Sequence, residues 1–268
     1  MTKKVTFDSK NRKGMNKLKT GICKSSIVVA AMLLAGCASN LKIHDGLTTT
    51  TPVTQNRDHA IYDWPSRHAA VVEYNRTHQP DIIVIGDSII HYWGGEPTAP
   101  KAWAPDVWKR TFAGWSVENL GFGWDRTENV LWRINHGELN GISPKLIIIL
   151  IGTNNSGINS ADDIADGIEA VCERAHEVQP RAKILLLGIL PRRDEAPVRP
   201  AITDQVNQIL RARLGKVSWI CYRDFGSAFR NPDGSVNAAL FADGVHPNHA
   251  GYAILGNLIH EQIVQILK

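Results

Sequence analysis

The sequence predicts an α/β fold in which a five-stranded parallel sheet is covered by helices on both faces, a three-layer α/β/α sandwich. Beyond residue 60, short apolar runs bounded by Gly, Asn or Pro alternate with longer segments of helical periodicity. This alternation is typical of a doubly wound parallel sheet. The composition agrees with a folded domain, since 43% of the residues are hydrophobic and 21% are charged, which are ordinary globular proportions.

Five apolar runs are predicted to form the strands. They are short and contain Ile, Leu and Val on successive positions rather than on alternate ones, which is typical of parallel strands buried on both faces. In chain order the runs are residues 82–85, 117–120, 146–151, 184–187 and 217–222.

The segments between these runs carry helical periods. Residues 161–178 place five small or apolar side chains on one face of a helix, and residues 201–214 and 250–267 behave in the same way. Cys172 and Cys221 fall on buried faces and are expected to be small core residues, although a disulfide between them stays possible. No internal repeat or second linker is present, so residues 61–268 are predicted to form one domain.

The N-terminal segment has a different character. Residues 1–36 hold eight Lys and Arg residues against Asp8, a net charge of +7, so the rest of the chain carries 22 basic and 25 acidic residues, a net charge of −3. The basic stretch leads into an apolar run over residues 27–35 that is about half the length of a membrane-spanning helix. This order predicts a signal peptide over residues 1–36.

The end of this segment, Leu34-Ala35-Gly36-Cys37, resembles the bacterial lipobox. The resemblance implies cleavage before Cys37, lipid attachment to its thiol, and an exported lipoprotein held at a membrane, with Ala38 favouring the outer membrane, on the periplasmic side or the cell surface. Ordinary signal cleavage near Cys37 is the alternative, and Met15 is an alternative start. Residues 37–60 are polar and Thr-rich, so we expect a lipidated N-terminus followed by a flexible tether.

Several function classes are excluded by the same data. The overall charge of +4 is positive only because of the leader, and the rest of the chain carries −3, so a nucleic-acid-binding body is not expected. No two of the four cysteines have C-x-x-C spacing, no H-E-x-x-H is present, and no phosphate-binding or dinucleotide-binding glycine motif follows a strand. We therefore predict a protein without a metal site and without a cofactor.

Polar residues collect after three of the predicted strands and before the last helix. The segments are Gly86-Asp87-Ser88-Ile89, Gly121-Phe122-Gly123-Trp124-Asp125, Gly152-Thr153-Asn154-Asn155 and Asp243-Gly244-Val245-His246-Pro247-Asn248. In an open parallel sheet, ligands bind beyond the carboxyl ends of the strands. We therefore expect these four segments to form one site.

The residue types in this site fit acyl transfer. A serine hydroxyl becomes a nucleophile when a histidine accepts its proton, and a carboxylate must hold that histidine in the correct tautomer. Ser88, His246 and Asp243 are the candidates for these roles. Preorganised donors must then stabilise the oxyanion. The candidates for oxyanion donors are the backbone N–H groups of Ser88 and of Gly123 or Trp124, and the side-chain amide of Asn154. The position two after Ser88 is Ile90, which excludes the G-x-S-x-G elbow of α/β-hydrolases.

These four segments resemble the sequence blocks of the SGNH, or GDSL, hydrolases. The resemblance implies the SGNH hydrolase fold, a flavodoxin-like three-layer α/β/α sandwich, and a Ser-His-Asp ester hydrolase. It extends over about residues 62–268. The segments Gly121–Thr127, Val130–Arg133 and Gly137–Leu139 are similar to those of the catalytic subunits of intracellular platelet-activating-factor acetylhydrolase and of related bacterial esterases. Trp124 departs from the family, which usually has the oxyanion glycine there.

The substrate is less closely specified. Exported bacterial proteins of this type resemble carbohydrate O-acetylesterases, which implies short acyl esters, above all acetyl esters of sugars. Trp93, Trp103, Trp108 and Trp124 fall near the first two loops and can stack on sugar rings, although Trp103 and Trp108 can equally fill the core. The segment His91–Gly95 is the favoured substrate-facing piece. The candidates for substrate contact are Asp87, Trp93, Trp124 and Asn155.

Two alternatives stay open from the sequence. One is a lysophospholipase or thioesterase of the same fold, acting on lipids. The other is a glycan-binding lipoprotein without catalytic activity. The sequence does not specify the oligomeric state.

Overall fold

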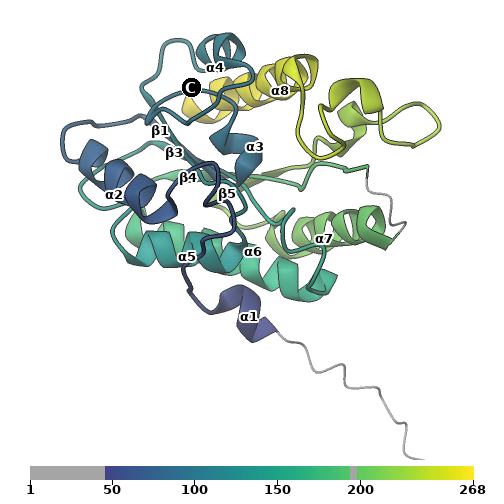
Figure 1. Ribbon diagram of the computed structural model, residues 1–268, viewed down its shortest axis with the longest axis horizontal. Helices are drawn as coiled ribbons and strands as arrows, with labels where there is room; N and C mark the ends of the chain where they lie inside the picture. Colours follow the sequence, from purple (N-terminus) through teal and green to yellow (C-terminus); the bar gives the residue numbers. More distant parts are fainter. Residues whose placement is uncertain (1–45, 194–197) are drawn as a thin grey trace, which may run out of the picture. The chain divides into compact units, whose positions relative to one another are not determined.

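The computed structural model describes residues 46–193 and 198–268. Five parallel strands form one sheet in the order β2-β1-β3-β4-β5 (Figure 1). The strands are β1 Ile82–Gly86, β2 Val117–Gly121, β3 Leu146–Leu150, β4 Lys183–Leu187 and β5 Ile220–Arg223. The predicted α/β class and the five-stranded parallel sheet are confirmed. The expected signal peptide, residues 1–36, and the expected lipidation site, Cys37, lie outside the described residues.

Helices cover both faces of the sheet (Figure 1). Helices α2, α5, α6 and α7 pack on one face, and α3, α4 and α8 pack on the other. Their bounds are α1 Gly46–Thr50, α2 Trp64–Asn75, α3 Ser88–His91, α4 Pro105–Thr111, α5 Thr127–Asn135, α6 Ala161–Val178, α7 Val198–Leu214 and α8 His249–Leu267, with 3-10 turns at Gly226–Phe229 and Ala238–Leu240.

The central strands are apolar at every position because each face contributes to a core. In β1, Ile83 and Ile85 pack toward α5 and α6, whereas Ile82 and Val84 pack toward α4 and α8. All four side chains are fully buried. Burial of each is worth roughly 1.5–3 kcal/mol, so this strand stabilises the core on both faces of the sheet.

The two described cysteines are free. Cys172 lies in the core on the α6 side of the sheet, whereas Cys221 packs against the core on the α8 side. Because the sheet separates them, they do not form the disulfide that the sequence left open.

Residues 48–62, which we call the N-terminal strap, differ from the flexible tether that was predicted to extend to residue 60. The Thr49 hydroxyl donates to the carbonyl of Asp163 at 2.7 Å, and the Thr49 carbonyl accepts from the Thr127 hydroxyl at 2.9 Å. Further along, the Val53 N–H donates to the carbonyl of Glu128. The tether prediction is wrong for this stretch. Hydrogen bonds of polar groups attach it to the domain, and such contacts produce no apolar periodicity in the sequence.

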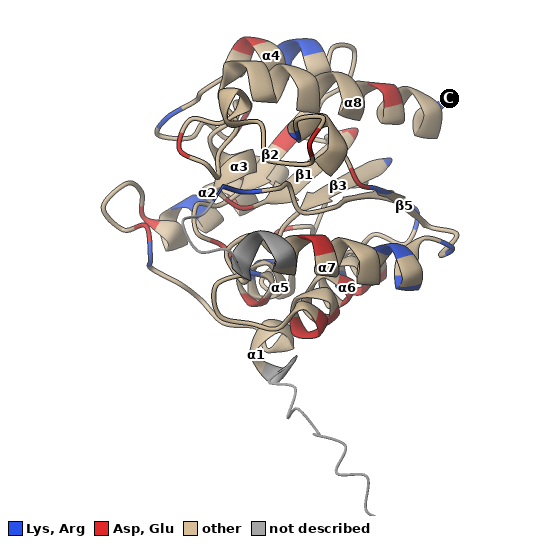
Figure 2. Ribbon diagram, turned by 90° about the vertical axis from the view of Figure 1, so that its right-hand side faces the viewer, with Lys and Arg blue, Asp and Glu red and all other residues tan. Residues whose placement is uncertain are grey.

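Charged residues of both signs lie on the outer helices (Figure 2). Arg213 on α7, for example, pairs with Asp162 and Asp166 on α6. None of the helices that the structure describes has the length and apolar character needed to cross a membrane.

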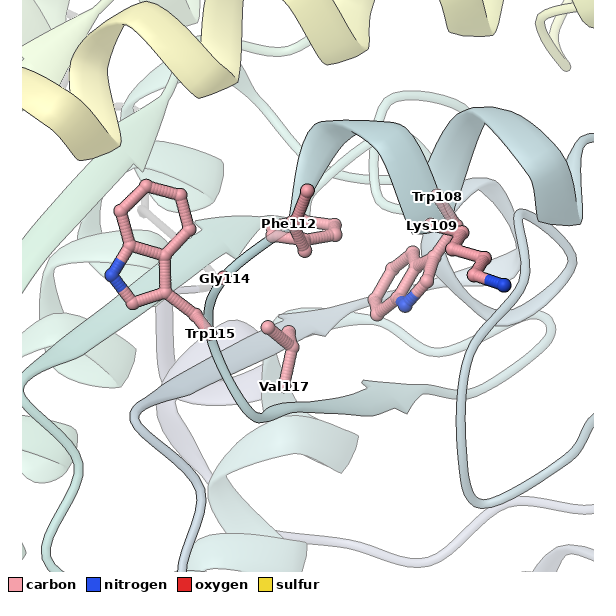
Figure 3. Close-up of a pocket in the computed structure, with 7 residues that line it drawn as sticks. Trp108, Lys109, Phe112, Gly114, Trp115 and Val117 are labelled. Atoms are coloured by element: carbon pink, nitrogen blue, oxygen red, sulfur yellow. The ribbon is translucent and has the colours of Figure 1, made fainter.

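A hollow of about 460 Å³ lies beside the chain that links α4 to β2 (Figure 3). Its lining is mostly apolar and aromatic and includes Trp108, Phe112 and Trp115. Val117, also in the lining, is the first residue of β2, so the hollow lies at the amino end of that strand. The polar segments singled out in the sequence lie at the opposite, carboxyl end of the sheet.

Candidate active site

The site lies where the strand order reverses. Strand β1 has β2 on one side and β3 on the other, so the loops that leave β1 and β3 separate and open a crevice at their carboxyl ends. Ser88 follows β1 and Asn154 follows β3.

A tight turn after β1 presents Ser88. A Cβ on Gly86 would lie 2.4 Å from the Cγ1 atom of Ile90 and 2.6 Å from the carbonyl oxygen of Leu150, so only glycine fits there. The Asp87 carboxylate then caps α3 by accepting from the Ile89 N–H at 2.9 Å. Ser88 is therefore the first residue of the short, capped helix α3.

Ser88, His246 and Asp243 form a continuous hydrogen-bonded chain. The Ser88 Oγ and His246 Nε2 atoms are 2.7 Å apart, and His246 Nδ1 and Asp243 Oδ2 are also 2.7 Å apart. The other carboxylate oxygen of Asp243 accepts from the backbone N–H groups of His246, at 2.9 Å, and Val245, at 3.0 Å. With a proton on Nδ1 facing the carboxylate, Nε2 of a neutral ring can accept the serine proton.

The carboxylate of Asp243 is kept ionised. Burial acts to raise its pKa, but the hydrogen bonds from His246 and Val245 outweigh burial and lower the pKa from its ordinary value. The negative charge needed to orient His246 is therefore present at neutral pH.

Three N–H donors are available beside Ser88. Within the part of the chain that the structure describes, the backbone N–H groups of Ser88 and Trp124 donate to no protein acceptor. The Asn154 side-chain amide donates one hydrogen to the carbonyl of Asp125 at 2.9 Å, which leaves the second for a ligand. The Gly123 N–H, which the sequence offered as an alternative donor, donates instead to Nδ1 of His91 at 3.0 Å.

His91 is suited to hold that N–H. Burial, together with the charges of Arg67 and Arg133, lowers the pKa of His91 to about 2, so the ring is neutral. Nδ1 is the acceptor, so the ring proton is on Nε2. Gly123 is thereby removed from the set of candidate oxyanion donors, and Trp124 remains.

Trp124 adopts a backbone conformation that disfavours side chains. Its φ is +63°, in the left-handed region, which costs a residue with a Cβ about 1–2 kcal/mol. Trp124 is nevertheless 50% exposed, and it lines the cavity beside Ser88. A residue keeps a disfavoured backbone conformation of this kind only where contacts with the surrounding structure hold it in place.

A cavity of about 240 Å³ opens over Ser88 and His246. The Trp103 ring meets the His246 ring edge-on, with centroids 5.0 Å apart. The other lining residues are Asp58, Ile61, Tyr92, Lys101, Trp124, Asn154, Arg192, Asp243 and Val245. Among the described residues, no cluster of three or more His, Cys, Asp or Glu side chains could hold a metal ion.

Three predicted substrate contacts are not in this cavity. Trp93 is fully buried between Trp108 and Tyr252, with ring centroids 5.4 and 5.2 Å away. Asp87 is buried beneath the nucleophile turn, where burial raises its pKa to about 7. Asn155 is also buried, and its amide donates to Glu128 at 3.1 Å. These three side chains are buried and do not line the cavity, so the prediction of substrate contact is wrong for them.

The remaining tryptophans divide between site and core. Trp124 and Trp103 line the cavity, whereas Trp108 packs in the core. Of the favoured segment His91–Gly95, Tyr92 reaches the cavity. The sequence missed Asp58 because it lies in the part of the strap that was expected to be a tether, and it missed Ile61 and Lys101 because neither belongs to a motif. Arg192 was not singled out as a site residue either.

A buried ionic network underlies the turn that carries Trp124. Asp125 accepts from Trp64 Nε1 at 2.8 Å and from Arg133 Nε at 2.8 Å. Arg133 also pairs with Glu138, and the arginine and both carboxylates are fully buried. Buried charges of this kind are tolerated when they are paired, so the network fixes where the turn lies on the sheet.

Known proteins resemble this chain in sequence. The sequence profile of the GDSL-like Lipase/Acylhydrolase family matches residues 84–254. The chain is 33% identical over 205 residues to the human platelet-activating factor acetylhydrolase IB subunit alpha2, covering 76% of this chain and 85% of that protein.

Two solved structures share the fold. A GDSL-like lipase from Bacteroides thetaiotaomicron is 24% identical with a TM-score of 0.55, covering 75% of this chain and 96% of that one. Est24, a carbohydrate acetylesterase from Sinorhizobium meliloti, is 16% identical with a TM-score of 0.55, covering 69% and 98%. The matching profile and the curated relative place the chain in the GDSL-like lipase/acylhydrolase family as an ester hydrolase.

Proposed function

We propose that the protein is a serine esterase that removes short acyl groups, above all acetyl groups, from carbohydrate esters through an acyl-enzyme. Ser88 is the nucleophile, His246 the general base and acid, and Asp243 the residue that orients His246. The oxyanion donors are the N–H groups of Ser88 and Trp124 and the side-chain amide of Asn154.

The reaction follows from these positions. His246 Nε2 accepts the proton as Ser88 Oγ attacks the ester carbonyl, and the oxyanion develops toward the three donors. Collapse of the tetrahedral intermediate breaks the bond to the alkoxide, which takes the proton from His246. A water molecule, deprotonated by His246, then attacks the acyl-enzyme, and the carboxylic acid leaves as Ser88 recovers its proton.

The small size of the cavity supports the short acyl group. About 240 Å³ lies over Ser88 and His246, whereas drug-sized ligands occupy pockets of roughly 300–1,000 Å³. An acetyl group and part of a sugar fill such a space, and a long acyl chain does not. The names of two similar proteins, an acetylhydrolase and a carbohydrate acetylesterase, agree with acetyl esters.

The aromatic lining supports the sugar. Tyr92, Trp103 and Trp124 surround the cavity, and aromatic rings provide flat apolar faces with polar edges, which suit the C–H faces of a pyranose. The exposed Trp124 and Ile61 at the rim are the observation that favours the alternative, a lipid ester substrate.

A chain-length series separates these substrates. We expect kcat/KM for p-nitrophenyl esters to be highest for acetyl and to fall at least about tenfold by octanoyl, because the longer chain does not fit the cavity. Release of acetate from acetylated xylan, sialic acid and peptidoglycan fragments would then identify the sugar. Activity that peaks at long chains would contradict the acetyl assignment, and no hydrolysis of any ester would favour a binding protein.

We also propose that the protein is exported and anchored to a membrane through lipid on Cys37. The basic leader, the apolar run and Leu34-Ala35-Gly36-Cys37 support this. Radiolabelled palmitate should be incorporated into the full-length protein and not into Cys37→Ser, with Cys221→Ser as the control. Equal labelling of the wild type and Cys37→Ser would contradict the anchor.

A further inference from the structure

One peptide group joins the strap to the candidate oxyanion donor. The carbonyl of Gly123 and the N–H of Trp124 belong to the same peptide, and in a trans peptide these two groups point in opposite directions. Whatever holds the Gly123 carbonyl therefore sets the direction of the Trp124 N–H.

Two strap side chains hold this carbonyl. The Gln55 side-chain amide donates to it at 2.9 Å, and the Tyr62 hydroxyl donates to it at 2.9 Å. Gln55 also donates to the buried carboxylate of Asp125 at 2.9 Å, so it ties the peptide to the ionic network below. Burial raises the pKa of Tyr62, and its hydroxyl keeps the proton that it donates.

The neighbouring groups of the turn are held as well. Arg57 of the strap donates to the Trp124 carbonyl from Nη2 at 3.0 Å. A Cβ on Gly123 would lie 2.4 Å from the Asp58 carboxylate and 2.7 Å from the Tyr92 hydroxyl, so the strap packs directly on this residue. The strap therefore contacts the residues on both sides of the Gly123–Trp124 peptide bond.

This support matters because the turn is strained. Trp124 has a φ of +63°, a conformation that a side chain disfavours, and an unsupported peptide can rotate away from it. Donors on a carbonyl also polarise its peptide group, which strengthens the N–H as a donor.

We propose that Gln55 and Tyr62 are positioning residues of the active site, which orient the Gly123–Trp124 peptide so that the Trp124 N–H points at the oxyanion. The inference rests on the proposed function. By this inference the strap contributes to catalysis, although it lies outside the residues matched by the family profile.

The kinetic test uses Tyr62→Phe, Gln55→Ala and the double variant of the full chain. Removal of an oxyanion donor costs about 10²–10³ in kcat, so we expect roughly a tenfold fall in kcat for each single variant with KM within twofold of the wild type. Asn56→Ala and Tyr74→Phe are matched controls, because no hydrogen bond links either side chain to the turn, and they should keep wild-type kinetics.

Binding of a methylboronic acid separates positioning from general support. The boron forms a bond to Ser88 Oγ and presents an oxygen at the oxyanion position, so its affinity should fall by the same factor as kcat/KM. The affinity for the product alcohol should be unchanged. Tyr62→Phe keeps the shape of the side chain, so it remains informative if Gln55→Ala does not fold.

The results bear on the two proposals separately. Suppose that the wild type is active and Ser88→Ala is inactive. If Tyr62→Phe and Gln55→Ala then keep full activity and full affinity for the boronic acid, the positioning role alone is overturned. A fall in the affinities for boronic acid and alcohol alike would also overturn it, since it would show general damage to the pocket. An inactive wild type would overturn both proposals.

Discussion

Replacing Ser88 with alanine is expected to lower kcat for a short acyl ester by about 10⁴- to 10⁶-fold. The Oγ atom lies 2.7 Å from His246 Nε2, and removing it leaves no nucleophile for the base to activate. The residue is buried at the start of α3, and loss of one hydroxyl leaves no gap larger than an oxygen atom. Steady-state kinetics on p-nitrophenyl acetate, with the melting temperature as a check of folding, measures the effect.

The coupling of the two residues sharpens this prediction. If Ser88 and His246 act as one unit, His246→Ala should cost about as much as Ser88→Ala, and the double variant should be no slower than either. Ser227→Ala, in the 3-10 turn at Gly226–Phe229, is the control for loss of a serine hydroxyl. Additive losses in the double variant, or activity in Ser88→Ala within tenfold of the wild type, would be inconsistent with the mechanism.

The second large effect is expected for Asp243→Asn, a fall in kcat of about 10⁴-fold. One carboxylate oxygen of Asp243 accepts two backbone N–H groups, so the amide oxygen of an asparagine would take that place. Its NH₂ group would then face His246 Nδ1. That contact requires an unprotonated Nδ1 and moves the ring proton to Nε2, which can no longer accept a proton from Ser88.

The pH dependence distinguishes this tautomer effect from lost stability. Hydrogen bonds lower the pKa of Asp243 in spite of its burial. The contribution of its carboxylate to kcat is therefore complete above the ordinary pKa of about 4, and it is lost as the pH falls through the lowered pKa of the folded protein. The kcat deficit of Asp243→Asn should therefore be constant from neutral pH down to about 5. Asp233→Asn, a surface carboxylate in a turn with Ser235, is the control. A deficit that disappears at neutral pH, or equals that of Asp233→Asn, would refute the orienting role.

The sheet could be predicted from the sequence because burial on both faces leaves continuous apolar runs. The motif residues were identified for a similar reason, since the chemistry demands particular residue types after particular strands. The first residue of β5 was less predictable. The N–H groups of Val217 and Ile220 donate to carbonyls of a turn. The strand therefore begins at Ile220, although the apolar pattern already begins at Val217.

The parts that escaped prediction depend on contacts distant in the sequence. Trp93 and Trp103 are equally aromatic, and the packing of Trp108 and Tyr252 on Trp93 places that residue in the core rather than in the cavity. The choice between Gly123 and Trp124 as donor depends on the acceptor at His91. The strap attaches through single polar side chains such as Gln55, and a polar Thr-rich composition cannot reveal such pairing.

The hydrogen bond between Ser88 and His246 joins segments that are 158 residues apart in the chain. In an unfolded chain these side chains meet rarely, because closing a loop of that length costs conformational entropy. The contact therefore forms only when the sheet and the helices between the two residues are folded. Its loss is a sign that the whole domain has unfolded, and not only one local element.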